Sequence, residues 1–150
     1  MKKFFFAIVF AAAALAVHAQ SVEKINEIVE SPEISYGQAA YLALSYSGDI
    51  DETAELADAL AAAVQKNWIK SGAVDTAAIK LGEFSALCVK ATGIKGGLFC
   101  RLTKNSPRYS FSELKSLRIL DKNADPAMKV SGQDALSLFN ACVKITEGSK

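Results

Sequence analysis

Apolar residues recur at helical spacing through most of the chain after residue 20, and one nine-residue pattern occurs three times. The three segments are 34–42, 79–87 and 130–138, which align without a gap. Each begins with a β-branched residue, namely Ile34, Ile79 or Val130. In the first and third copies a serine precedes a glutamine or an aspartate by three positions, which is the spacing of a capping box. The pattern therefore predicts a helix start in each copy.

The remaining periodicity predicts three further helices, each lying before one of the repeated segments. We expect them at 21–30, 53–70 and 110–121, with Gly48, Gly72 and Gly93 ending the helices that precede them. The predicted fold is all-α, with about six helices in three helix-loop-helix units and little or no strand. The glycine-rich stretch 96–102 is expected to be an ordered loop packed by Leu98, Phe99 and Leu102, with at most one extended segment.

The N-terminus has the three parts of a secretory signal peptide. Lys2 and Lys3 precede an apolar run over 4–17, and small residues occupy the two positions that a signal peptidase reads. We expect cleavage after Ala19, which leaves 20–150 as a single helical domain in the periplasm or outside the cell. The apolar run is short for a bilayer span, so no membrane span is expected in the mature chain.

Charge and chemistry narrow the function further. Removal of Lys2 and Lys3 leaves fifteen basic against sixteen acidic residues, which does not favour nucleic acid as a partner. Cleavage also removes His18, the only histidine, and with it imidazole for base catalysis or zinc binding. The three cysteines lack metal-ligand spacing. We therefore expect a non-enzymatic protein without a metal or cofactor.

Three cysteines allow three single disulfides, each leaving one thiol over. Cys88 and Cys100 are the easiest to join, because Gly96 and Gly97 let the chain turn back toward the end of the preceding helix. Cys142 lies on the apolar face of the last predicted helix and would then remain as a small core residue. The expected disulfide is Cys88–Cys100.

Three helix-loop-helix units with these repeated helix starts resemble the S-layer homology (SLH) domain across nearly the whole mature chain. The family's Thr-Arg-Ala-Glu signature corresponds to the segments 35–38, 80–83 and 131–134. The resemblance implies an SLH-like three-repeat fold and contact with cell-wall glycan. Tyr36, Leu81 and Gly132 replace the signature arginines, however, so the family's two-pronged contact with acidic wall polymers is not expected.

Two sets of residues are candidates for binding. Trp68 could stack on a sugar, although a single tryptophan at the end of an alanine-rich helix is more often a core plug. A basic cluster on the glycine-rich stretch could grip an anionic polymer or a partner's carboxylates, although basic loop residues are often simply solvated. This cluster comprises Lys95, Arg101, Lys104 and Arg108.

These features predict a binding or structural protein of the cell envelope that contacts wall glycan or an envelope protein. The alternatives are a purely structural subunit of an envelope assembly and a carboxylate-dependent glycan hydrolase. The hydrolase would use Glu83 and Glu113 as its paired carboxylates. Both glutamates occupy helix-start positions, where a capping role already accounts for them.

Overall fold

Helices make up the architecture of this computed structural model, which describes residues 22–148. Within that range the extended pairings are two isolated antiparallel bridges, Ser35–Ala78 and Lys80–Lys129, and no strand forms. The predicted all-α fold is confirmed. A first helix covers 22–30, and the others are α2 (Tyr36–Ser47), α3 (Leu56–Gln65), α4 (Leu81–Thr92), α5 (Leu98–Leu102), α6 (Pro107–Ser116) and α7 (Gly132–Glu147).

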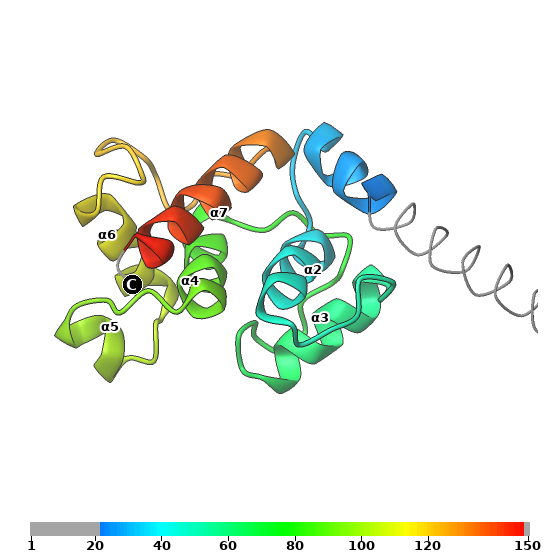
Figure 1. The fold of residues 1–150 in the computed structure, drawn as a ribbon, viewed down its shortest axis with the longest axis horizontal. Coiled ribbons are helices and arrows are strands. Elements are labelled where there is room, and N and C mark those ends of the chain that lie inside the picture. The colour runs from blue at the N-terminus through cyan, green and yellow to red at the C-terminus, as the bar shows by residue number, and fades with distance from the viewer. Residues whose placement is uncertain (1–21, 149–150) are drawn as a thin grey trace, which may run out of the picture.

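Helix α4 lies at the centre of the molecule. It contacts α2 on one side and α6 on the other, while α7 packs across it (Figure 1). Eight of its twelve residues are buried, including Phe84 and Leu87 with no exposed surface. The hydroxyl of Ser85 is buried as well and donates to the Leu81 carbonyl at 2.7 Å. Its burial therefore does not leave the hydroxyl without a hydrogen-bond partner. A helix that is buried on most of its circumference organises the core around itself.

The three repeated segments meet where their helices begin. Ile34, Ile79 and Val130 are equivalent in the repeat and are all buried. The amide of Ile79 donates to the Ile34 carbonyl at 3.0 Å, and the amide of Ile34 donates to the Val130 carbonyl at 2.8 Å. The β-branched residues thus join the starts of α2, α4 and α7 through their backbones. Each of these residues directly precedes the N-cap residue of its helix, whose backbone is extended.

The helix caps largely follow the sequence prediction. Ser35 and Gln38 form a complete capping box at the start of α2. Ser131 accepts from the amide of Asp134, whose carboxylate accepts from the Ser131 hydroxyl and not from its backbone amide. Gly48 and Gly93 end α2 and α4 in the left-handed conformation, with φ of 74° and 70°. Leu87 of α4 and Phe139 of α7 are both buried.

Two helices, α3 and α6, differ from the prediction at both ends. Helix α3 covers Leu56–Gln65, whereas a helix over 53–70 was expected. The chain leaves the helix because Asn67 adopts a positive φ of 56°, which asparagine tolerates better than most residues. Helix α6 covers Pro107–Ser116, whereas a helix over 110–121 was expected. Proline is accepted there because the first helical position needs no amide donor.

The stretch 96–102 is not the packed loop that was expected. Residues Leu98–Leu102 form the short helix α5, and the side chains of Leu98, Phe99 and Leu102 are 77%, 62% and 76% exposed. Cys100 is the one buried residue of this helix. Apolar residues usually pack inward, but α5 turns these three toward the surroundings.

The expected Cys88–Cys100 disulfide is absent, because all three cysteines are free thiols. Cys88 hydrogen bonds with Cys142 of α7, and burial, followed by this contact, raises the pKa of the Cys88 thiol well above its ordinary value. Cys100 instead packs near Gly96 and Glu113. Helix α4 directs Cys88 toward α7, whereas Cys100 packs beside α6. The two thiols of the predicted pair therefore have different neighbours.

Candidate binding groove

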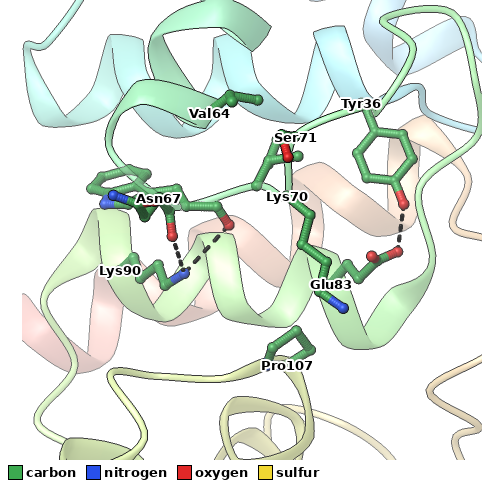
Figure 2. Close-up of a pocket in the computed structure, with 10 residues that line it drawn as sticks. Tyr36, Val64, Asn67, Lys70, Ser71, Glu83, Lys90 and Pro107 are labelled. Carbon is green, nitrogen blue, oxygen red and sulfur yellow. Dashed lines mark hydrogen bonds between the residues drawn. The ribbon is translucent and has the colours of Figure 1, made fainter.

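A groove of about 560 Å³ opens between the end of α3, the first and last turns of α4, and the start of α6 (Figure 2). This volume falls within the range of small-molecule sites in proteins. Polar and aromatic groups from four separate segments line it. The lining residues are Tyr36, Val64, Asn67, Trp68, Ile69, Lys70, Ser71, Glu83, Lys90 and Pro107.

The turn after α3 forms one wall of the groove. Asn67, with its positive φ, reverses the chain, and the amide of Trp68 then donates back to the Ala63 carbonyl at 2.9 Å. Trp68 is half-buried: it packs against the core and also lines the groove. The ammonium group of Lys66 lies 5.0 Å from the centre of the indole ring, which is a cation–π distance.

Lys90 fixes this wall to the central helix. Its Nζ donates to the carbonyls of Asn67 and Trp68, each at 3.3 Å (Figure 2). Burial lowers the pKa of Lys90, because desolvation disfavours the charged form. The lysine satisfies carbonyls that the left-handed turn leaves without helical partners, and its ammonium group stays at the surface of the groove.

Tyr36 and Glu83 join the first turns of α2 and α4. The phenol of Tyr36 donates to the Glu83 carboxylate at 2.6 Å (Figure 2). The expected capping role of Glu83 is wrong, because the start of α4 has no side-chain cap hydrogen bond and the carboxylate serves Tyr36 instead. Tyr36 belongs to the first repeated segment and Glu83 to the second, so two of the repeated helix starts lie directly at this groove.

We expect Tyr36 to titrate at an unusually high pH. Burial, the hydrogen bond to Glu83 and the charge of Glu83, in that order, raise its pKa from 10.0 to about 12. A pKa raised by folding favours the folded state below pH 10, and this contribution is lost as the pH rises from 10 to about 12. Phenolate absorbance of the wild type and of Tyr36→Phe measures the difference. If the phenol that Tyr36→Phe removes proves to titrate near pH 10, the pairing with Glu83 is contradicted.

The basic cluster of Lys95, Arg101, Lys104 and Arg108 lies outside the groove. All four side chains are exposed and belong to α5, its flanking segments and the first turn of α6. Arg101 donates through Nε to the Gly96 carbonyl at 3.3 Å. Of the predicted binding residues, Trp68 is therefore the one that the structure places in the groove, and the four cations belong to a different surface.

The proposed carboxylate pair does not share a cavity. Glu83 lines the groove, whereas Glu113 lines a separate pocket beside Lys95 and accepts from the Gly97 amide at 3.1 Å. Paired carboxylates of a glycosidase must flank one scissile bond. Glu83 and Glu113 do not meet this requirement.

Sequence reasoning missed half of the groove residues. Asn67, Lys70, Ser71, Lys90 and Pro107 come from three segments that are distant in sequence. No local motif links these segments, since the groove arises where the turn after α3, helix α4 and the start of α6 come together in the fold. The repeated segments were the available signal, because Tyr36 and Glu83 belong to them and both line the groove.

Comparison of the chain with protein-family models, with curated proteins and with solved structures found no match. Over residues 22–148, no cluster of three or more histidine, cysteine, aspartate or glutamate side chains has a geometry that could hold a metal ion. None of the helices in this part of the chain combines the length and apolar character needed to cross a bilayer. The predicted signal peptide, with its cleavage after Ala19, lies outside the described residues.

Proposed function

We propose that this protein is an exported, non-enzymatic binding protein of the cell envelope that holds cell-wall glycan in the groove beside Trp68. The observation that carries the proposal is the groove itself, in which one indole ring and six polar side chains from separate segments face a volume of about 560 Å³. A sugar needs this combination, because its ring faces are apolar and its hydroxyls need several hydrogen-bond partners.

Trp68 supplies the apolar contact in this proposal. Its attachment to the core and the two hydrogen bonds from Lys90 to the turn hold the ring in place before a ligand arrives. A wall fixed in this way loses little conformational freedom on binding, which favours affinity. The positive φ of Asn67 fits the same role, since strained residues persist where a binding site requires them.

The charges of the groove favour an acidic glycan. Lys70 is exposed and extends across the opening in Figure 2, and the Lys90 ammonium group lies beneath the turn. Glu83 opposes these two cations, but its carboxylate already accepts from Tyr36. Lys70 is thus available to meet a carboxylate or phosphate of the glycan, a contact that the missing signature arginines would otherwise supply.

The SLH resemblance and the predicted signal peptide support an envelope location. The repeated segments, with their equivalent buried residues, are the part of the sequence that resembles SLH domains. We infer that the chain retains an SLH-like three-repeat arrangement and binds wall glycan through a different set of groups. A structural subunit would share this location but would need no groove.

Retention on isolated cell wall tests the function. We expect the mature protein to be retained, and Lys70→Ala to weaken retention about tenfold through loss of a charged hydrogen bond. Lys144→Ala is the matched control, because Lys144 is exposed on α7 and lines no described pocket. Retention on walls stripped of glycan would instead indicate a protein partner, and turnover of wall fragments would contradict a non-enzymatic role.

A further inference from the structure

Helix α5 presents its apolar side chains to the surroundings. Leu98, Phe99 and Leu102 fall at positions i, i+1 and i+4 and therefore share a face, and each exposes more than three fifths of its side chain. Phe99 is stacked on Tyr109 of α6 at a ring separation of 5.7 Å, which holds its ring in place without burying it. Adjacent large apolar side chains that are exposed together mark an interaction surface more often than chance exposure does.

The same surface is strongly basic. Lys95, Arg101, Lys104 and Arg108 all lie within seven positions of the apolar face and are exposed. No acidic residue occurs between Glu83 and Glu113, although acids and bases nearly balance over the whole chain. The acid nearest to α5, Glu113, already accepts from the Gly97 amide. The partner of this surface should therefore be both negatively charged and able to bury apolar groups.

We propose that α5 docks on an anionic lipid surface, with Leu98, Phe99 and Leu102 entering the boundary between headgroups and acyl chains. The four cations of the basic cluster would then meet the lipid phosphates. This arrangement of a small apolar face within a basic rim is that of interfacial membrane anchors, which lie on a bilayer without crossing it. The surface lies apart from the glycan groove and can act independently of it.

The position of α5 favours lipid over a protein partner. Figure 1 shows α5 at an outer corner of the molecule, beside α6 and away from α2 and α3. A deformable lipid interface accepts such a projecting short helix, whereas a protein would need a matching concave pocket. Two of the four cations are lysines, which are depleted in protein interfaces but common at anionic lipid surfaces.

Flotation with vesicles tests the proposal on the mature protein. We expect binding to vesicles of phosphatidylglycerol and phosphatidylcholine, and much weaker binding to phosphatidylcholine alone. Joint replacement Phe99→Ser and Leu102→Ser should weaken binding at least tenfold. The joint replacement of Arg101 and Lys104 by glutamine should weaken binding to the anionic vesicles on the order of twentyfold. Added salt should also weaken this binding.

Matched controls separate docking from general stickiness or unfolding. Val74→Ser and Met128→Ser remove side chains that are 57% and 51% exposed elsewhere, and Lys122→Gln with Lys144→Gln removes two distant cations. These controls should bind like the wild type, and all variants should keep the helical dichroism spectrum. Absence of binding to anionic vesicles, equal binding to both vesicle types, or equal losses in test and control variants would overturn the proposal.

Discussion

Replacing Gly132 by alanine should lower the free energy of unfolding by about 3 kcal/mol or more, at the upper end of overpacking effects. A Cβ atom at this position would lie 1.6 Å from the carbonyl oxygen of Ile28 and 2.7 Å from its carbon. Both atoms belong to the backbone of the first helix, so no change of rotamer relieves the clash. The helix has to move away from α7.

The movement would also break a hydrogen bond that joins the two helices. The amide of Gly132 donates to the Ser31 carbonyl at 2.8 Å, just after the first helix ends. Urea denaturation measures the loss, and Gly97→Ala serves as the matched control. A Cβ at Gly97 would meet its nearest neighbour at 3.6 Å, an ordinary contact. Equal stability of the two variants would contradict the close packing of the first helix on α7.

Phe84→Ala should destabilise the protein by about 3 to 5 kcal/mol, because it opens a large cavity in the core. Phe84 has no exposed surface and lies on α4, the helix that contacts α2, α6 and α7. The side chains around the resulting cavity belong to α4 and to the helices packed on it. The cavity therefore cannot close without moving several helices at once.

Phe99→Ala is the control for this prediction. The residue type is the same, but Phe99 is 62% exposed on α5. The aromatic contact described for it is the stacking of its ring on Tyr109. We expect its replacement to change stability by about 0.5 kcal/mol or less. Thermal and urea unfolding followed by dichroism compare the two variants. Similar losses at Phe84 and Phe99 would show that α4 is not the centre of the core.

The sequence predicted the features that short-range chemistry determines. The starts of α2 and α7 follow from serine caps, and the ends of α2 and α4 follow from Gly48 and Gly93. These signals act within one turn of a helix, so neighbouring residues suffice to recognise them. The all-α fold class was predictable for the same reason.

Features that depend on tertiary packing were not predictable. Nothing local required Asn67 to leave the helical region, and the apolar pattern continued beyond it, so α3 was predicted too long. Leu98 and Phe99 were assigned to a packed loop because sequence pattern does not show whether a short apolar run faces a core or the surroundings. The groove was missed because Lys70, Lys90 and Pro107 come together through the packing of helices around α4.

The most direct measurement of the central proposal is the fluorescence of Trp68. This residue is the only tryptophan of the chain, so its emission reports on the groove without labelling. Titration with solubilised acidic wall glycan should shift the emission to shorter wavelength and saturate, with about tenfold weaker affinity for Lys70→Ala and unchanged affinity for Lys144→Ala. Emission that stays constant while the protein is still retained on cell wall would contradict binding in the groove.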